Sequence, residues 1–367
     1  MTVHVPIHED RDASYDIVIG RGLLAELPRR LAERCPAAAY AVLSDSHVGK
    51  LYGVAVAAAL VQAGMRAALL TFPAGEWNKT RETWSGLSDR MLAHHFGRDA
   101  VVVALGGGVV GDLAGFVAAT YLRGIPYAQV PTSLLAMIDS SIGGKTGVDA
   151  PAGKNLLGAF HQPRFVLADL DVLSTLPPPQ VSAGTAEALK HGVIADADYF
   201  ALLEREHRAV LARDPGVLEE VVRRSVDIKA QVVARDEREA GLRAVLNFGH
   251  TVGHAIEALA KFEASHGEAV AVGMVIEARL GEAIGVTEAG TAQRIARALE
   301  CYQLPLELPA TATATALLDA MRHDKKAREA ELRFALPARI GAMHRGADGS
   351  HTVAAPEQAV LKALGGK

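Results

Sequence analysis

Polar side chains at helical spacing mark one segment of the sequence as a candidate for chemistry. Arg243, Asn247, His250 and His254 follow one another at steps of four, three and four residues. On a helix such positions share one face, because residues three and four apart are neighbours. A solvated helix face is the simpler interpretation, but two histidines flanked by apolar residues favour a face that binds a ligand. We therefore expect a binding site along residues 243–254.

A metal site is the chemistry that these histidines suggest. His266 lies in a short polar loop farther along the chain, and Glu187 lies upstream with Lys190 at i+3. One carboxylate and two imidazoles from separate elements are the protein ligands of a catalytic zinc-type site, which keeps one position open. His250 and His254 could instead form a local pair, as in H-E-x-x-H, but the residue after His250 is threonine and the general base of that motif is missing. Spacing alone leaves open which histidines are the ligands.

Cationic side chains recur beside the asparagines, glycines and histidines of these segments. A single lysine is usually surface decoration, so the prediction rests on the repetition. Such a set would bind a substrate with two anionic groups through charge-assisted hydrogen bonds. The cations are Lys145, Lys154, Lys190, Lys229, Arg243, Lys325 and Lys326.

A glycine-rich turn at residues 106–111 is a candidate phosphate site. An apolar strand-like run leads into Gly106, Gly108 and Gly111, which satisfy G-x-G-x-x-G, and then into a helical stretch. A helix N-terminus of this kind attracts phosphate, although the glycines could equally be a packing device. The candidate ribose-binding acids, Asp45 and Glu76, lie upstream and not about 20 residues downstream as in an ordinary Rossmann domain. We expect dinucleotide binding by a variant topology.

A second glycine cluster, at residues 139–146, ends like a Walker A loop. Asp139 occupies the position where a P-loop requires glycine. The cluster therefore predicts a polar substrate loop that carries the cation Lys145, and not a nucleoside triphosphatase site.

The elements that must position these residues change in character along the chain. Short β-branched runs alternate with amphipathic stretches in the first half, which favours an α/β domain with a largely parallel sheet. The predicted strands are residues 15–19, 39–43, 67–71, 100–105, 127–130 and 165–169, with helical stretches between them such as 23–33 and 51–63.

Three consecutive prolines at 177–179 mark the best boundary in the chain, because they cannot continue a helix or a central strand. Helical periodicity dominates beyond them, at residues 185–194, 215–235, 247–260, 268–284 and 291–299. The expected fold is an N-terminal variant Rossmann-like dinucleotide-binding domain (1–176) with a C-terminal, mainly helical, metal- and substrate-binding domain (177–367). A cleft between the two is the expected ligand site.

Composition narrows the class of protein. The 367 residues include 38 Lys and Arg against 42 Asp and Glu, a net charge of −4 that indicates neither a nucleic-acid nor a membrane partner. Two cysteines fit a reducing compartment. The N-terminal residues lack the pattern of a secretory signal, and no stretch approaches the ~20 apolar residues of a membrane span. We expect a cytoplasmic enzyme.

Taken together, the motifs resemble those of the 3-dehydroquinate synthase family, in the family's order over roughly residues 40–335. The matching segments are residues 106–112, 129–135, 139–146, 153–155, 186–192, 236–239, 246–256 and 266–268. The resemblance implies a homodimeric lyase of the shikimate pathway that uses NAD and one Zn²⁺ or Co²⁺ per subunit. Its substrate would be the sugar phosphate 3-deoxy-D-arabino-heptulosonate 7-phosphate. The reaction would oxidise a hydroxyl transiently, eliminate phosphate, reduce the ketone again and close a carbocycle by aldol addition.

The resemblance also assigns site residues. The metal ligands would be Glu187, His250 and His266, with His254 near the substrate hydroxyls and Arg123 supplied by a neighbouring subunit. The other substrate-site residues would be Asp139, Lys145, Asn155, Lys190, Lys229, Glu239, Arg243, Asn247 and one of Lys325 and Lys326. The NAD contacts would be Asp45, Ala74, Gly75, Glu76, Trp77, Asn78, Lys79, Gly108, Val109, Val110, Gly111, Asp112, Thr132, Ser133, Lys145, Lys154, Val172, Leu173, Ser174 and Thr175.

The sequence departs from the family's pattern in two places: Ala74 replaces the usual Asp before Gly-Glu, and the context of Met137 and Ile138 replaces the usual Gln before Asp-Ser-Ser.

Two other enzymes stay open as alternatives. One is a different sugar phosphate cyclase of secondary metabolism, and the other is a metal-dependent polyol dehydrogenase. The dehydrogenases typically carry a Lys three residues after the Asp that corresponds to Asp112, where this chain has Gly115. A non-catalytic dinucleotide sensor would not need the metal and anion residues.

Overall fold

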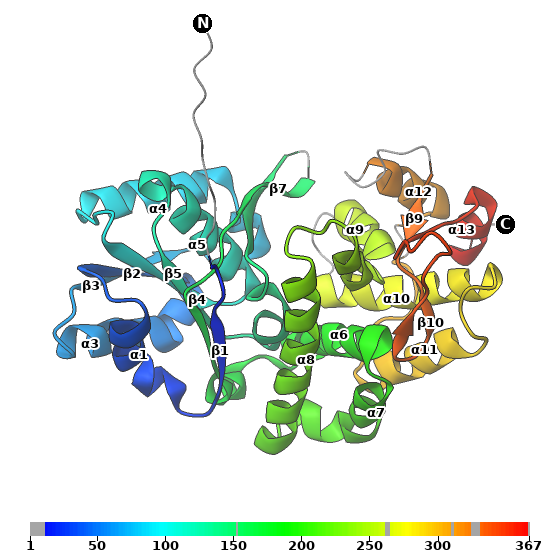
Figure 1. Ribbon diagram of the computed structural model, residues 1–367, viewed down its shortest axis with the longest axis horizontal. Coiled ribbons are helices and arrows are strands. Elements are labelled where there is room, and N and C mark those ends of the chain that lie inside the picture. Colours follow the sequence, from blue (N-terminus) through cyan, green and yellow to red (C-terminus); the bar gives the residue numbers. More distant parts are fainter. Residues whose placement is uncertain (1–11, 152, 261–264, 310–311, 324–330, 366–367) are drawn as a thin grey trace, which may run out of the picture.

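The computed structural model describes residues 12–151, 153–260, 265–309, 312–323 and 331–365. A half built around a β-sheet and a half built of helices lie side by side along the long axis (Figure 1). The sheet half comes first in the sequence and the helical half second, as expected.

Six parallel strands form the sheet, in the order β1-β8-β5-β4-β2-β3. All six strands predicted from the sequence are present. Their bounds are β1 Asp16–Gly20, β2 Ala39–Asp45, β3 Ala67–Phe72, β4 Ala100–Gly106, β5 Tyr127–Pro131 and β8 Phe165–Asp169. Both faces of the central strands are covered, which explains why they read as continuous apolar runs.

Strand β4 shows how the two faces divide the core. Val101 and Val103 pack on one side with α1 (Leu27–Arg34) and α3 (Val54–Gln62). Val102 and Ala104 pack on the other side with α4 (Arg81–Ala93) and α5 (Gly108–Thr120). Successive side chains of a strand point to opposite faces, so one apolar run supplies both layers.

The strand order reverses next to β2. β3 lies on one side of β2 and β4 lies on the other, and β5 and β8 continue beyond β4. Because all the strands are parallel, their carboxyl ends share one edge. In open α/β sheets ligands bind at this edge, near the point where the strand order reverses.

Helices make up most of the second half, with α10 near its centre. The elements are α6 Pro178–Ala195, α7 Ala197–Leu211, α8 Pro215–Arg235, α9 His250–Leu259, α10 His266–Ala283, α11 Thr291–Cys301, α12 Ala314–His323 and α13 Glu357–Ala363. Two small antiparallel pairs accompany them, β9 (Arg333–Phe334) with β12 (Val353–Ala354) and β10 (Pro337–Arg339) with β11 (Ala342–Met343). Within the described ranges, every helix is too short or too polar to span a membrane.

Two predicted helix starts were wrong. α6 begins at Pro178 inside the proline run and not at residue 185, because proline in the first turn lacks only an N–H that has no helical partner anyway. The helix expected from Asn247 begins only at His250. Gly249 has a left-handed φ of 80°, and Arg243 and Asn247 belong to the preceding 3-10 turn, Leu242–Asn247. The four-residue polar stripe therefore comes from two elements.

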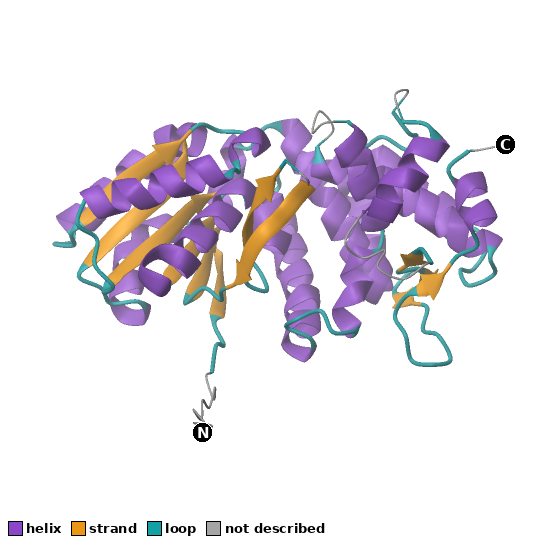
Figure 2. Cartoon of the chain, turned by 90° about the horizontal axis from the view of Figure 1, so that it is seen from above, coloured by secondary structure: helices purple, strands orange, loops and turns teal. Residues whose placement is uncertain are grey.

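The sequence interpretation missed a β-hairpin between the two halves. β6 (Lys145–Ala150) pairs with β7 (Gly153–Phe160), and Figure 2 shows this hairpin beside the main sheet and next to the helices. Gly147 and Gly158 face each other across it. A Cβ on Gly158 would lie 2.3 Å from the carbonyl oxygen of Thr146, so the glycines permit the close approach.

Candidate active site

A buried carboxylate on α6 is the centre of the site. Glu187 is fully buried, and Lys190, one turn along the same helix, forms an ion pair with it. Burial by itself raises the pKa of Glu187. The ammonium group of Lys190 and the imidazole of His250 lower this pKa by more than burial raises it, so the pKa lies well below its usual value. A charged pair in the middle of a packed helix has no purpose in packing alone, which points to function.

Two histidines converge on Glu187 from different helices. Its Oε1 atom lies 3.4 Å from Nε2 of His250, at the start of α9, and 3.3 Å from Nε2 of His266, at the start of α10. Ligand atoms of the three residues lie within 4.8 Å of one another. Neither carboxylate oxygen of Glu187 has a well-aligned hydrogen bond within the described part of the chain. One carboxylate and two imidazoles that converge in this way suit a zinc-type ion with an open coordination position.

Two buried glutamates that the sequence interpretation missed support the histidines. Glu277 of α10 accepts hydrogen bonds of 2.7 Å from Gly249 N and 3.0 Å from Val252 N, and so anchors the turn that presents His250. Glu257 of α9 lies 3.5 Å from Nδ1 of His266. A signal was available, because each glutamate interrupts an otherwise apolar helical stretch.

A second group of metal-ligating atoms shares Glu187. Atoms of Asp139, Glu187 and His191 also lie within 4.8 Å of one another. The Nζ atom of Lys229 is 2.6 Å from Oδ1 of Asp139, and Lys190 is paired with Glu187. The ammonium group of Lys229 at Asp139 disfavours a dication at this second group, whereas Lys190 pairs with Glu187, which both groups share.

Several predicted substrate residues lie next to the group Glu187, His250 and His266. Lys229 of α8 is 6% exposed and Arg243 is 3% exposed, and Arg243 donates a 3.2 Å hydrogen bond to Gly143 O of the polar loop. Burial lowers the pKa of Lys229, and the neighbouring Asp139 opposes this shift. Two buried cations of the helical half therefore meet around Asp139 of the sheet half.

Glu239 connects two further predicted residues. It pairs with Lys145 of β6 and accepts a 2.8 Å hydrogen bond from Nδ2 of Asn247. Lys145 is itself half exposed, with 49% of its side chain accessible. The hairpin therefore carries one cation to the rim of the site.

Other predicted residues lie farther out. The ring of His254 is 5.3 Å from that of His250 and 6.4 Å from that of His266, outside the three-residue group. Asn155 is exposed, and its backbone N–H bonds to Asp149. Arg123 is exposed in the sheet half. Lys325 and Lys326 lie outside the described residues.

Most of the predicted cofactor residues share the carboxyl edge of the sheet, whereas Lys145 and Lys154 lie on the β6–β7 hairpin. Asp45 ends β2, residues 74–79 follow β3, residues 108–112 follow β4, Thr132 and Ser133 follow β5, and residues 172–175 follow β8. Five strands thus present them to one region, although the sequence separates the first from the last by 130 residues. This edge, at the reversal of strand order, is where α/β sheets bind dinucleotides.

A buried lysine organises part of this edge. The Nζ atom of Lys79 lies 3.0 Å from Glu76, 3.3 Å from Asp112 and 3.8 Å from Asp149. Burial raises the pKa of Asp112 to about 6, although Lys79 opposes the shift. The cluster ties the turn after β3 to the start of α5 and to the hairpin.

The glycine-rich turn at residues 106–111 has features of both a packing device and a phosphate site. A Cβ on Gly106 would lie 2.4 Å from the side chain of Val110, so this glycine is needed for packing, whereas one on Gly111 would meet only the end of the Gln129 side chain, at 2.7 Å. Gly107 caps α5, which places the N-terminus of a 13-residue helix at the carboxyl end of β4. Such a helix end favours an anionic group.

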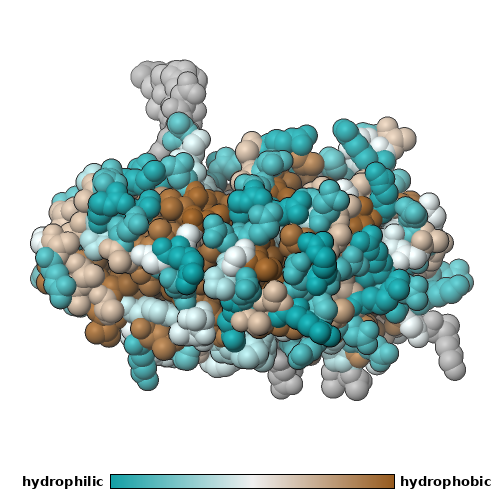
Figure 3. Space-filling view, turned by 90° about the horizontal axis from the view of Figure 1, so that it is seen from below, coloured by the Kyte–Doolittle hydropathy of each residue, from teal (hydrophilic) through white to brown (hydrophobic). Residues whose placement is uncertain are grey.

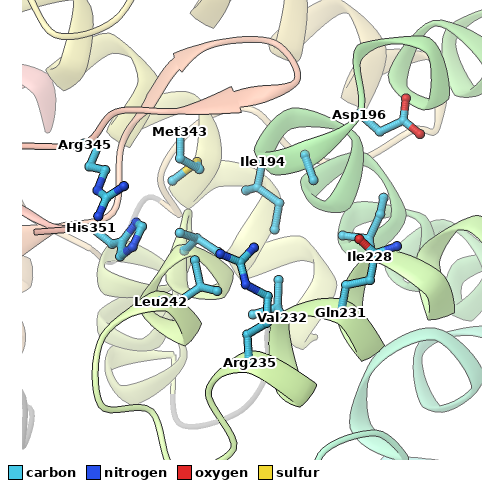
Figure 4. Close-up of a pocket in the computed structure, with 12 residues that line it drawn as sticks. Ile194, Asp196, Ile228, Gln231, Val232, Arg235, Leu242, Met343, Arg345 and His351 are labelled. Carbon is cyan, nitrogen blue, oxygen red and sulfur yellow. The ribbon is translucent and has the colours of Figure 1, made fainter. Parts of the chain in front are cut away.

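A hollow in the helical half is lined by other residues. Its volume is about 410 Å³, and it lies between α6, α8 and the segment 342–351 (Figure 4). Ile194, Ile228 and Leu242 form part of its apolar wall, and Arg235 and His351 also line it. None of the predicted site residues lines this hollow, so it is not the expected site.

Known proteins resemble this chain in sequence and in fold. Family profiles described as 3-dehydroquinate synthase N-terminal and C-terminal match residues 69–183 and 184–327. The 3-dehydroquinate synthase of Symbiobacterium thermophilum is 51% identical over 89% of this chain and 92% of its own, and that of Caulobacter vibrioides is 49% identical over 90% and 91%.

Several solved structures resemble this chain over nearly its whole length. The 2-epi-5-epi-valiolone synthase ValA from Streptomyces hygroscopicus, with NAD⁺ and Zn²⁺ bound, is 31% identical over 98% of each chain, with a TM-score of 0.88. A 2-deoxy-scyllo-inosose synthase with NAD⁺, Co²⁺ and carbaglucose-6-phosphate is 28% identical over 95% of this chain and 96% of its own, with a TM-score of 0.87. A glycerol dehydrogenase from Schizosaccharomyces pombe, 18% identical over 98% and 91% with a TM-score of 0.67, shares the fold alone. With both family profiles matched in succession and relatives about half identical over nine-tenths of its length, this chain belongs to the 3-dehydroquinate synthase family.

Proposed function

We propose that this chain is a 3-dehydroquinate synthase that converts 3-deoxy-D-arabino-heptulosonate 7-phosphate to 3-dehydroquinate and phosphate, with NAD and one Zn²⁺ or Co²⁺. The observation that carries the proposal is the convergence of Glu187, His250 and His266 beside the buried cations Lys190, Lys229 and Arg243. The 51% identity to a 3-dehydroquinate synthase supports this substrate over those of the sister cyclases at 28% and 31%.

The site residues divide the work between a metal and two anionic groups. A divalent metal held by Glu187, His250 and His266 would supply Lewis acidity at a substrate hydroxyl. Lys190, Lys229 and Arg243 would bind the phosphate and carboxylate ends of the substrate, together with Asp139, Lys145, Asn155, Glu239, Asn247, His254 and one of Lys325 and Lys326. Fixing both ends of one flexible molecule would make ring closure an oriented intramolecular step.

We further propose that NAD lies along the carboxyl edge of the sheet. Its pyrophosphate would bind at the start of α5, where backbone N–H groups and the helix dipole favour negative charge. Asp45, Glu76 and Lys79 would contact the rest of the dinucleotide, with Ala74, Gly75, Trp77, Asn78, Gly108, Val109, Val110, Gly111, Asp112, Thr132, Ser133, Lys145, Lys154, Val172, Leu173, Ser174 and Thr175. NAD would take up hydride from the substrate and return it, so that no net NADH forms.

The chain is proposed to act as a homodimer through its sheet half, with Arg123 donated to the partner's site. Leu122 and Arg123 have φ values of 49° and 70°, a left-handed conformation that is uncommon outside glycine and recurs at functional sites. Within the described ranges, the exposed large hydrophobic residues all belong to the sheet half and its hairpin: Leu51, Val54, Val61, Trp77, Leu92, Leu157 and Phe160. Apolar surface also gathers toward the sheet half on the face shown in Figure 3.

Two further assignments complete the proposal. Residues 1–176 would form the NAD-binding domain and residues 177–367 the metal- and substrate-binding domain. The location would be the cytoplasm, where Cys35, which is buried, and Cys301, which is exposed, would stay reduced.

The test follows phosphate release from 3-deoxy-D-arabino-heptulosonate 7-phosphate and NADH absorbance in one cuvette, before and after chelation. Phosphate release that a chelator stops and Zn²⁺ or Co²⁺ restores, without net NADH, is the expected result. Net NADH formation from a polyol would assign the chain to the dehydrogenases instead. Turnover only of hexose or heptose phosphates that lack a carboxylate would assign it to the sister cyclases.

A further inference from the structure

Glu257 is a buried carboxylate that faces a predicted metal ligand and a lysine of the other half. It lies on α9 with 1% of its surface exposed. Its Oε1 atom accepts a hydrogen bond of 2.7 Å from Nζ of Lys154, and its Oε2 atom lies 3.5 Å from Nδ1 of His266. Its neighbours Ala255 and Ile256 are apolar and buried, so the position would favour an apolar residue if packing alone decided it.

The contact with His266 decides which ring nitrogen can bind a metal. Nε2 of His266 lies 3.3 Å from Oε1 of Glu187, on the side where His250 also converges. An imidazole whose Nδ1–H donates to a carboxylate has its lone pair on Nε2, its ring orientation fixed and its basicity raised. Glu257 is placed to impose this tautomer on His266.

The two histidines are held by different means. Nδ1 of His250 lies 3.1 Å from the carbonyl oxygen of Phe248, a backbone group. His266 lies at the first position of α10 and faces the side chain of Glu257 on another helix. Replacement of one side chain can therefore loosen His266 while His250 keeps its own support.

Lys154 holds Glu257 from the sheet half. It lies on β7, and its Nζ atom is also 3.6 Å from Oε1 of Glu76, a member of the Lys79 cluster. A line of charged contacts thus runs from His266 through Glu257 and Lys154 to the carboxyl edge of the sheet. The carboxylate of Glu257 is held from both sides and does not depend on a flexible surface contact.

We propose that Glu257 is a positioning residue for the metal, which fixes His266 with Nε2 directed at the ion and connects that ligand to the β6–β7 hairpin. This inference rests on the proposed function, in which Glu187, His250 and His266 bind a divalent ion. Glu257 itself does not touch the metal or the substrate.

The test measures metal affinity without catalysis. Metal-free, full-length protein is titrated with Co²⁺, the visible absorption of the bound ion is recorded, and Zn²⁺ affinity is obtained by competition with a chromophoric chelator. Glu257→Gln is expected to weaken metal binding by about 10- to 100-fold. Glu268→Gln is the matched control: it removes the same charge two residues from His266, and Gln preserves the capping-box bond to Ser265 N. This control is expected to bind within about twofold of wild type, since Glu268 is only partly buried and its amide variant keeps the helix cap.

A second measurement on the wild-type protein does not depend on any variant folding. The ¹⁵N spectrum of histidine-labelled, Zn²⁺-loaded protein is expected to show His266 protonated at Nδ1 and metal-bound at Nε2. The opposite tautomer, or equal metal affinity of Glu257→Gln and Glu268→Gln, would overturn the role of Glu257 alone. A wild-type protein that binds neither Co²⁺ nor Zn²⁺ would overturn the proposed function and this inference together.

Discussion

Lys229 and Asp139, ninety residues apart in sequence, are joined by a hydrogen bond of 2.6 Å between Nζ and Oδ1. Lys229 belongs to α8 of the helical half, and Asp139 belongs to the turn Ala136–Ser140 after β5. The same ammonium group also donates a 2.6 Å bond to the carbonyl oxygen of Asp139. This contact pins the polar loop of the sheet half against the helical half.

Removing the ammonium group alone is expected to destabilise the protein. Lys229→Met leaves the carboxylate of Asp139 partly buried without its partner, and breaking a buried pair in this way costs about 3–5 kcal/mol. The loss should lie near the lower end, because 20% of the side chain of Asp139 is exposed. Urea unfolding of Lys229→Met, Asp139→Asn and the double variant checks this. The double variant should be more stable than Lys229→Met, and simple additivity of the two losses would contradict the prediction.

Acid sensitivity should arise in part from His191. Burial, reinforced by the charge of Lys190, lowers the pKa of this imidazole from its ordinary value of 6.5 to about 3. The unfolded chain therefore takes up a proton below pH 6.5 that the folded chain rejects until pH 3 is approached, so stability is lost as the pH falls through this window.

Each pH unit in that window corresponds to about 1.4 kcal/mol for one such group. Between about pH 7.5 and pH 5, wild type should lose about 2 kcal/mol more stability than His191→Gln, which cannot take up the proton. Urea unfolding midpoints of the two proteins at both pH values test this expectation. Parallel losses in the two proteins would show that His191 does not titrate in this way.

The close approach of α9 and α10 should depend on Gly273. A Cβ at this position would lie 2.0 Å from the carbonyl oxygen of Gly249, a backbone atom that cannot move without shifting the start of α9 and His250. Gly273→Ala should therefore cost about 3 kcal/mol and weaken metal binding as well. Gly86 provides the matched control, because it lies exposed in α4 with no atom within 4 Å of its Cβ position.

Gly86→Ala is expected to stabilise the chain by about 0.5–1 kcal/mol, since alanine loses less backbone entropy in a helix. Thermal unfolding of the metal-free proteins gives the stabilities, and Co²⁺ titration gives the affinities. If Gly273→Ala matched Gly86→Ala in both measurements, the packing explanation would be wrong.

Arg123 should act on the partner's site in a homodimer. Arg123→Ala and Lys229→Met homodimers are each expected to be inactive. A purified heterodimer of the two variants contains one complete site if Arg123 crosses the interface, and it should show about half of the wild-type activity. Co-expression of differently tagged chains supplies the heterodimer. An inactive heterodimer would place Arg123 in its own subunit's site, and a monomeric protein would exclude the exchange.

The strands were predictable because a strand that is buried on both faces is apolar at nearly every position. Runs such as residues 101–105 are apolar at every position, since β4 supplies side chains to cores on both of its faces. The helix after Asp214 was equally predictable, because its aspartate cap and first-turn proline are local signals. The hairpin at residues 145–160 could not be predicted from a local pattern. Its glycines are needed for the close approach of the facing strand, which is not adjacent in the sequence.

The sequence by itself determined which residue types are available: a carboxylate at 187, histidines at 250, 254 and 266, and cations around them. Only the tertiary structure brings His250 and His266 together with Glu187, because this convergence depends on where α10 begins relative to α9 and α6. It also decided the contacts of Glu257 and Glu277, whose partners lie on other elements. Spacing along one helix carries local information, whereas a metal site is defined by distances between helices that only packing fixes.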